Sequence, residues 1–330
     1  MGVLFIGGTG NISAAASRLA LARGIELHLL TRGQRGGIAG AHEIVGDIRR
    51  PDEVRNALRG QRFDAVVNWI AFNPAEIERD LDLFVGVTRQ YIFISSASAY
   101  QKPPSHPVIT ESTPLRNPFW QYSRDKIACE ERLNRAYRET GFPVTIVRPS
   151  LTYDTLFPIA IGGWGCYTIV DRLKAGRPLI VHGDGTSLWT VTHSDDFAKG
   201  LVGLLGNPAA VGHAFHITSD ELLTWDAIYQ TIAGAVGVEA DLVHIPSDFI
   251  HRVVPWVGEG LLGDKAHSVI FDNSKIKAFV PEFRATIPFH EGARRTLAWF
   301  EADASRRVVK PSEHEVMDRI IAAYRAGAGN

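Results

Sequence analysis

The sequence predicts an α/β fold in which a doubly wound parallel sheet is followed by a smaller C-terminal lobe. Three observations support this. Short apolar runs alternate with segments of helical length through the first 150 residues. A glycine-rich turn joins the first run to the first helix, and after about residue 150 the regularity loosens into stretches rich in Gly, Pro and aromatic residues. Strands that alternate with helices at this spacing indicate right-handed βαβ units and a parallel sheet.

Six strands with helices between them are expected in the first half of the chain. The strands are the short apolar runs Val3–Ile6, Glu26–Leu30, Glu43–Val45, Ala65–Asn68, Tyr91–Ile94 and Val144–Val147. The helices are Asn11–Arg23, Pro51–Leu58, Pro74–Val85 and Gln121–Thr140. Gly24 stops the first helix, and Pro51 followed by two acidic residues is typical of a helix start.

The chain is expected to divide at about residue 150. Residues 1–150 form the sheet domain, and residues 151–330 form mainly a lobe over the carboxyl edge of the sheet, with returns to the sheet at about 179–217. A turn at Gly183–Gly185, a short strand at Thr190–Thr192 and helices at Asp195–Leu205 and Trp225–Val236 are expected in this part.

Composition excludes several classes of protein. The formal net charge is −1, so we expect no nucleic-acid partner that is bound by phosphate neutralisation. Cys129 and Cys166 lie outside any CxxC pattern and are expected to be reduced thiols. The chain shows no secretory signal and no apolar stretch that could span a bilayer, which predicts a cytoplasmic protein without a membrane partner.

The loop Gly7-Gly8-Thr9-Gly10-Asn11-Ile12-Ser13 predicts a dinucleotide site. Glycines permit a tight turn and close approach of the backbone to a pyrophosphate, and the following helix offers free N–H groups and the positive end of its dipole. The spacing is GxxGxxS, and a serine is small enough for close packing of helix on strand.

The residues after the second strand bear on the choice of cofactor. An acidic residue there would bind the ribose 2′-hydroxyl of NAD, but this chain has Thr31-Arg32-Gly33-Gln34-Arg35. A guanidinium suits a 2′-phosphate, so NADP is favoured over NAD. The alternative is that Arg32 stacks on adenine or faces solvent.

Three residues predict acid–base chemistry. Tyr122 and Lys126 stand four apart on one helix face, and a nearby ammonium is expected to lower the pKa of a phenol. Such pairs are common by chance. Here, however, Ser95-Ser96-Ala97-Ser98-Ala99-Tyr100 follows the fifth strand, where open α/β sheets bind ligands, and a serine there can contact the reacting oxygen.

With these motifs the chain resembles the extended short-chain dehydrogenase/reductases, the NAD-dependent epimerase/dehydratase family. The resemblance covers nearly the whole chain and implies a Rossmann-type sheet with a substrate-binding C-terminal lobe. The motifs are Gly7–Ser13, Asp47-Ile48, Ser95–Tyr100, Tyr122–Lys126, Arg148-Pro149-Ser150, Gly183–Thr186, His193–Asp196 and Asp272–Lys275.

The resemblance implies roles for individual residues. Aligned on Ala99-Tyr100, it makes Ser96 the catalytic serine, beside Tyr122 and Lys126. It implies that Asp47 and Ile48 lie beside adenine and that Trp69, Ile70 and Ala71 line the cofactor path. Pro149 would belong to the same site, and Lys126 could hold the nicotinamide ribose.

The chain departs from the family pattern at three places. The dehydratases carry Asp-Glu after the catalytic hydroxyl residue, where Ala97-Ser98 stand here, so dehydration is disfavoured. Members that bind nucleotide sugars usually have an asparagine where this chain has Leu151. They also have an arginine for the substrate diphosphate near the position of Trp189, so a nucleotide sugar is less favoured as substrate.

We therefore expect an NAD(P)-dependent enzyme that moves hydride at a carbinol carbon of a sugar or sugar-nucleotide-like substrate. Epimerisation is slightly favoured, because about 180 residues after the sixth strand can enclose a large polar substrate. One alternative is a simple NADP-dependent alcohol dehydrogenase or ketoreductase. An alternative of another class is a non-catalytic dinucleotide sensor or RNA-associated scaffold. The resemblance also implies a homodimer through Gln121–Thr140 and a neighbouring helix.

Other candidate residues predict little. His213 and His216 point to opposite faces of a strand, so no metal site is expected. Asp195-Asp196 are expected to cap a helix. No GxSxG surrounds Ser95, which argues against a serine hydrolase. Trp164–Tyr167 is either core packing or a wall of the substrate pocket.

Overall fold

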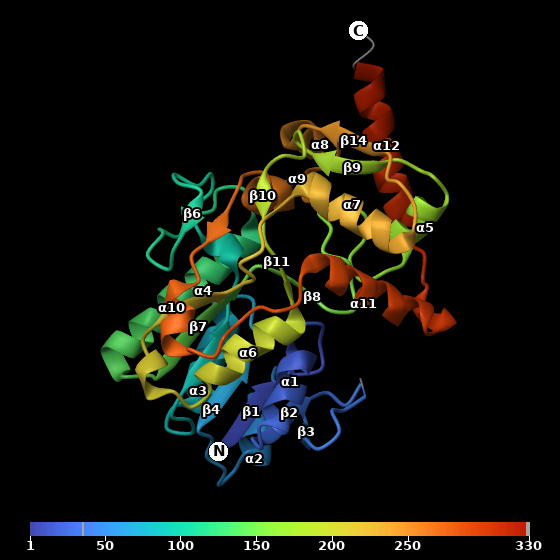
Figure 1. Ribbon diagram of the computed structural model, residues 1–330. Coiled ribbons are helices and arrows are strands. Elements are labelled where there is room, and N and C mark those ends of the chain that lie inside the picture. The colour runs from blue at the N-terminus through green and yellow to red at the C-terminus, as the bar shows by residue number, and fades with distance from the viewer. Residues whose placement is uncertain (35, 328–330) are drawn as a thin grey trace.

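The computed structural model describes residues 1–34 and 36–327. Seven parallel strands form the central sheet in the order β12-β7-β5-β4-β1-β2-β3 (Figure 1). Their bounds are β1 Gly2–Ile6, β2 Glu26–Thr31, β3 His42–Val45, β4 Ala65–Asn68, β5 Tyr91–Ile94, β7 Val144–Pro149 and β12 Ala214–Ile217. The predicted doubly wound parallel sheet is confirmed, and its topological switch lies between β1 and β4, where such sheets bind ligands.

Helices cover both faces of the sheet because the strand side chains alternate between two apolar cores. Val3 and Phe5 pack in one core with α1 (Ser13–Ala22) and α6 (Ser194–Leu204). Leu4 and Ile6 pack in the other core with α2 (Pro51–Ala57), α3 (Pro74–Phe84) and α4 (Gln121–Thr140). Side chains of one strand point to opposite faces in turn, which explains this division.

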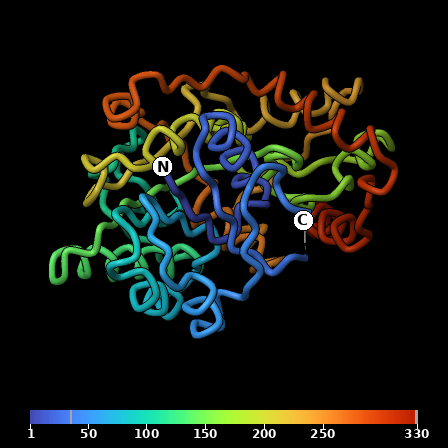
Figure 2. The backbone as a smooth tube through the Cα atoms, turned by 90° about the horizontal axis from the view of Figure 1, so that it is seen from below, coloured from blue at the N-terminus to red at the C-terminus, as the bar shows by residue number. Residues whose placement is uncertain are grey.

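The second lobe has its own apolar core, built mainly from aromatic and aliphatic side chains. It contains α5 (Thr168–Lys174), α7 (Trp225–Val236), α11 (Phe289–Glu301) and the strand pair β9 (Leu179–His182) and β14 (Leu242–Ile245). A further cluster joins α8 (Ser247–Val253), α9 (Pro255–Gly260), the π-helix η3 (Leu261–Lys265) and α12 (Pro311–Gly327). In both views α12 and α4 lie at opposite sides of the molecule (Figures 1 and 2).

Three short strand pairs connect the sheet and the lobe. They are β8 (Leu151–Tyr153) with β11 (Val191–His193), β10 (Leu188–Trp189) with β13 (Leu223–Thr224), and β6 (Val108–Ile109) with β15 (Ile270–Phe271), the last followed by α10 (Ser274–Phe279). Together with the lobe core, they place the lobe beyond the carboxyl ends of the sheet strands (Figure 1).

Two sequence-based expectations need correction. The return to the sheet predicted at about 179–217 is narrower, because β9 pairs with β14 inside the lobe and only β12 joins the central sheet. The residue that caps α6 is His193, whose ring accepts from the backbone N–H of Asp195. Asp196 instead lies inside the first turn, where its buried carboxylate binds Lys199 and the backbone of Ile287.

Candidate active site

A cavity of about 1400 Å³ extends along the carboxyl ends of the sheet strands to the second lobe. All of the predicted catalytic and cofactor residues except Ala71 line it. They are Gly7, Thr9, Gly10, Asn11, Ile12, Arg32, Asp47, Ile48, Trp69, Ile70, Ser96, Tyr122, Lys126 and Pro149. Ala71 is buried beside it, and its carbonyl accepts a hydrogen bond from Lys126. Residues far apart in the sequence thus meet in one cleft.

The glycine loop is shaped so that no side chain could replace its second glycine. Gly8 has a φ of +104°, and a Cβ there would come 2.7 Å from Leu29 Cδ2. The Gly8 carbonyl is held by the Ser17 hydroxyl at 2.8 Å, and the Gly10 N–H donates to Ser13 Oγ at 2.8 Å. The loop therefore presents bare backbone to the cavity at the start of α1, which fits the pyrophosphate of a dinucleotide.

Two arginines line the end of the cavity where the resemblance implies adenine. Arg49 makes a bidentate ion pair with Asp47, and its hydrogen bonds hold the pKa of that carboxyl well below its usual range. Arg32 is exposed, and its charge lowers the same pKa to a lesser degree. Ile48 is buried beside them and offers an apolar contact. The sequence analysis did not predict Arg49 as a cavity residue, because no motif around it indicates a role in binding.

Lys126 is buried on α4 and turned towards backbone carbonyls. Its Nζ donates to the carbonyls of Ala71 at 2.7 Å and Ile94 at 2.9 Å. Burial lowers the pKa of Lys126 to about 8. These two bonds use two of the three ammonium protons and fix the side chain at the edge of the sheet, with one donor left for a ligand.

Ser96 caps a short 3₁₀ turn, Ala97–Ala99, directly after β5. Its hydroxyl lies 2.9 Å from that of Ser98, which in turn accepts from Ser123 of α4 at 2.8 Å. This chain of hydroxyls fixes the orientation of the Ser96 hydroxyl at the cavity wall, which Ser98 also lines. Ser98 and Ser123 are structural partners that the sequence motif alone did not reveal.

Tyr122 lies on α4 between Trp120, with ring centroids 4.8 Å apart, and Phe72, at 6.5 Å. Burial raises the pKa of Tyr122 to about 12, while Ser96 lowers it and the charge of Asp264 raises it. The expectation that Lys126 lowers this pKa is wrong, because the ammonium faces backbone carbonyls and lies 5.9 Å from the ring centroid. The phenol is therefore protonated at neutral pH.

Comparison with known proteins agrees with this geometry. Residues 3–218 match the model of the NAD dependent epimerase/dehydratase family. The chain belongs to this family.

Two relatives each align with three quarters of this chain. It is 26% identical over 251 residues to 2'-dehydrokanamycin reductase of Streptomyces kanamyceticus, covering 75% of this chain and 70% of the relative. It is 28% identical over 264 residues to the chloroplast stem-loop binding protein of 41 kDa b of Arabidopsis thaliana, covering 75% of this chain and 67% of the relative.

The fold is also shared with solved structures. The UDP-glucuronic acid 4-epimerase from Bacillus cereus in complex with NAD superposes with a TM-score of 0.72 at 17% identity, covering 93% of this chain and 100% of the other. At this level of identity the similarity concerns the fold alone.

This member of the family is apolar at the two positions where the resemblance implied substrate contacts. Leu151 and Trp189 are both buried in the core of the second lobe, at 5% and 1% exposure. Trp189 Nε1 has no hydrogen-bond partner among the described residues, and Lys102 lies 5.6 Å from the centre of its ring system. Trp189 thus belongs to the core and does not line the cavity.

Sequence reasoning missed Asp264, whose charge acts on Tyr122, and the two lysines that face this carboxylate. Asp264 and Lys265 end the π-helix η3 and line the cavity, joined by an ion pair of 3.0 Å. Lys102, which is buried, faces the same carboxylate at 3.9 Å. A π-helix often marks a functional site, but it is set by tertiary packing and leaves no clear sequence signal.

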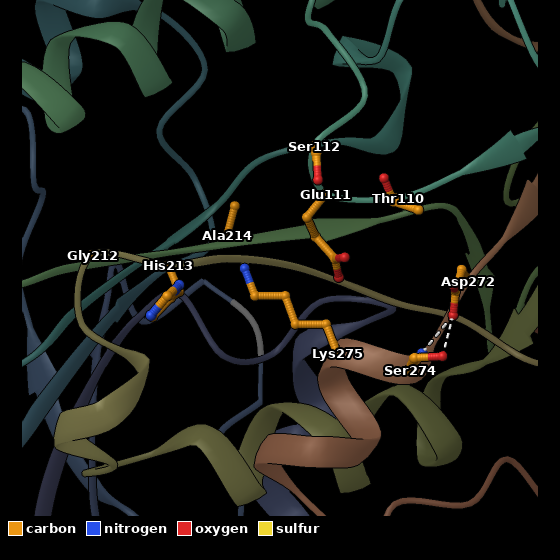
Figure 3. A pocket seen from close by; sticks show the side chains of 9 residues that line it. All are labelled: Thr110, Glu111, Ser112, Gly212, His213, Ala214, Asp272, Ser274 and Lys275. Carbon is orange, nitrogen blue, oxygen red and sulfur yellow. Dashed lines mark hydrogen bonds between the residues drawn. The ribbon is translucent and has the colours of Figure 1, made fainter.

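A smaller hollow of about 400 Å³ lies along β12, the outer strand of the sheet (Figure 3). Lys275 extends into it between His213 and Glu111, and Asp272 accepts two hydrogen bonds from Ser274. It contains none of the predicted catalytic or cofactor residues. Among the described residues no group of His, Cys, Asp and Glu is arranged to hold a metal ion.

In the same described part of the chain, no helix is both long enough and apolar enough to cross a bilayer. Cys129 and Cys166 are free and buried.

Proposed function

We propose that this protein is an NAD(P)-dependent oxidoreductase that interconverts an alcohol and a ketone on a sugar-like substrate. The meeting of Ser96, Tyr122 and Lys126 in one cavity with the glycine loop of β1 carries this proposal. A bound nicotinamide cofactor would supply or accept the hydride. The backbone of Gly7–Ile12 would hold its pyrophosphate, and Asp47, Ile48 and Arg32 would surround its adenosine end.

The protein's own residues handle the proton and the oxygen. Tyr122 donates its phenolic proton to the carbonyl oxygen during reduction and takes a proton back from the alcohol during oxidation. Ser96 donates a hydrogen bond to the same oxygen, since its hydroxyl is oriented by Ser98. Lys126 remains charged beside them at neutral pH, and the N–H donor that its two carbonyl bonds leave free can hold the nicotinamide ribose.

Net reduction or oxidation is favoured over epimerisation because two positions that could anchor a substrate are apolar. An epimerase must let the keto intermediate turn while it stays bound, which calls for an anchor outside the reacting ring. The positions where the resemblance implied such an anchor are Leu151 and Trp189, both apolar. The relative from Streptomyces kanamyceticus is described as a reductase, which also supports net reduction.

Epimerisation is the second candidate. It is supported by structural neighbours described as sugar-nucleotide epimerases and by a cavity large enough to allow a substrate ring to turn. The relative from Arabidopsis thaliana is described as a stem-loop binding protein, which supports an RNA-associated role. A net charge of −1 and the catalytic trio favour an enzyme instead.

One assay separates the two enzymatic outcomes. Candidate ketosugars and sugars are incubated with purified protein and only a catalytic amount of cofactor, and product is followed together with absorbance at 340 nm. Reduction or oxidation predicts product that stops at the amount of cofactor supplied, with a matching absorbance change. Product in large excess over cofactor, with constant absorbance, would establish epimerisation.

A further inference from the structure

We propose that the inner, lobe-facing half of the cavity selects a polyhydroxylated substrate that carries a basic amine and no phosphate, and that Glu313 pairs with this amine. The proposal rests on the proposed function, because it names the substrate class of the same site. Six side chains of the cavity wall carry it: Trp120, Trp164, Trp256, Asp264, Lys265 and Glu313.

The charges in this half of the cavity do not suit a diphosphate. The two arginines that line the cavity, Arg32 and Arg49, lie at its adenine end. In the lobe-facing half the only cation in the described lining, apart from Lys126 of the trio, is Lys265, and it is already bonded to Asp264 at 3.0 Å. A diphosphate buried here would lack the charge-assisted hydrogen bonds that such an anion requires.

Glu313 is the carboxylate of this wall that has no counter-ion. It stands in the first turn of α12, half-buried, and no hydrogen bond or ion pair involves its side chain within residues 1–34 and 36–327. It packs against Gly163, where an added Cβ would come 2.7 Å from Glu313 Cγ. A half-buried carboxylate at the wall of a cavity attracts a cationic ligand group.

The glycine against which this carboxylate packs is followed in the sequence by an aromatic residue that lines the same cavity. Trp164 follows Gly163 directly, and its indole N–H donates to the carbonyl of Ile159 at 2.9 Å, which fixes the ring. The ring is 47% exposed and lines the cavity. Indole faces attract ammonium groups through cation–π interaction, so Trp164 and Glu313 together form a site for an amine.

The remaining residues suit the hydroxyl groups of the substrate. Asp264 lies close enough to Tyr122 for its charge to raise the pKa of the phenol, and its partner Lys265 faces the ring of Trp120 at 5.7 Å. This pair offers a hydrogen-bond acceptor and a donor next to the reacting carbon, as neighbouring hydroxyls require. Trp120 and Trp256 add flat apolar faces on which a sugar ring can lie.

Binding measurements test the proposal without turnover. The full chain, saturated with NADPH, which cannot accept hydride from an alcohol, is titrated with kanamycin A and with glucosamine, with the N-acetylated derivative of each, and with UDP-glucose. Isothermal calorimetry or tryptophan fluorescence reports the affinity. We expect each amine to bind at least about tenfold more tightly than its N-acetylated derivative. No preference for the amines, or tightest binding of UDP-glucose, would overturn the proposal.

Matched variants assign the amine to Glu313. Glu313→Gln removes the charge, and Glu315→Gln makes the same change at an exposed position of the same helix. Glu313→Gln should remove the preference for amines and leave the affinity for the N-acetylated probes unchanged, whereas Glu315→Gln should bind like the unmodified protein. If the charge of Glu313 only stabilises the N-terminus of α12, the Glu313→Gln variant will melt at a lower temperature and its affinities for the probes will be unchanged. That result would overturn the proposal.

These outcomes are separate from the fate of the proposed function. Binding that follows the amine, without any hydride transfer to or from cofactor, would leave the substrate class standing and refute the oxidoreductase. Hydride transfer with substrates that lack an amine, at equal affinity, would do the opposite.

Discussion

Tyr122 is a protonated acid whose surroundings oppose ionisation. Burial raises its pKa to about 12, and a hydrogen bond with the hydroxyl of Ser96 acts in the opposite direction, lowering the pKa. Tyr122→Phe keeps the ring between Trp120 and Phe72 and removes only the proton. We expect turnover to fall by about 10²-fold or more, while the affinity for cofactor stays within about twofold. Steady-state kinetics with a cofactor titration check this, and retained turnover would refute the acid–base role.

Lys126 should set the alkaline limit of activity. Burial lowers its pKa to about 8, so most Lys126 side chains are protonated at pH 7 and lose this proton as the pH rises through about 8. Tyr122 keeps its proton over the same range. We expect kcat/KM for reduction to be level near pH 6.5 and to fall about tenfold per unit above pH 8. A pH–rate profile measures this.

The control is Lys126→Arg, whose guanidinium keeps its charge to much higher pH. This variant should show no such fall in activity, even at a lower maximal rate. A level profile for the unmodified protein up to pH 9.5 would contradict the assignment.

Arg32 is exposed at the end of the cavity where we propose that adenine binds, and Arg49 there is already paired with Asp47. Since no ion pair of Arg32 is found among residues 1–34 and 36–327, its guanidinium should bind a 2′-phosphate. We expect NADP to bind about tenfold or more tightly than NAD, and Arg32→Ala to abolish the difference. Calorimetric titration of both cofactors measures it, with Arg50→Ala as the control because Arg50 pairs with Glu53 outside the cavity. Equal affinities in the unmodified protein would leave Arg32 as a surface residue.

At the scale of the element, one face of α4 carries both the chemistry and its support. Tyr122, Lys126 and Glu130 follow at intervals of four, so they lie along the same side of the helix. Glu130 is fully buried and accepts hydrogen bonds from Ser95 of the catalytic loop and from Arg148 of β7. This carboxylate therefore ties the helix to the two strands whose ends form the site.

Replacing Glu130 should lower the stability of the whole fold. Glu130→Ala leaves the guanidinium of Arg148 buried without its counter-ion, and Nη1 of Arg148 already has no partner among the described residues. We expect the free energy of unfolding to drop by about 3–5 kcal/mol. Urea denaturation measures it against Glu131→Ala, an exposed neighbour that should change stability by about 0.5 kcal/mol or less. Equal effects of the two substitutions on the free energy of unfolding would argue against a stabilising role for the buried hydrogen bonds of Glu130.

At the scale of the whole molecule, α4 and α3 remain available for a partner. They pack against each other at the side of the molecule opposite α12, and the pair Glu78–Arg132 joins them at the surface. We propose that two copies pair through these helices. Light scattering after gel filtration should give twice the 36.3 kDa of one chain.

A charge placed on this face tests the arrangement. Ala128→Glu on α4 should yield monomers, while Ala322→Glu on the exposed side of α12 should not. A monomeric unmodified protein would refute the pairing.

The sequence by itself determined what depends on neighbours along the chain. Strands such as Tyr91–Ile94 were predictable because continuous apolar runs mark a strand that is buried on both faces. The glycine loop and the helix Gln121–Thr140 were predictable because backbone freedom and helical periodicity are local properties.

Only the tertiary structure decided what depends on residues distant in the chain. It turns the ammonium of Lys126 towards backbone carbonyls, so the pKa of Tyr122 is set by burial first, then by the hydroxyl of Ser96 and last by the charge of Asp264. It keeps β9 in the second lobe and brings Glu313 of α12 against Gly163. No periodicity encodes these contacts, because they arise only when two separately built cores pack together.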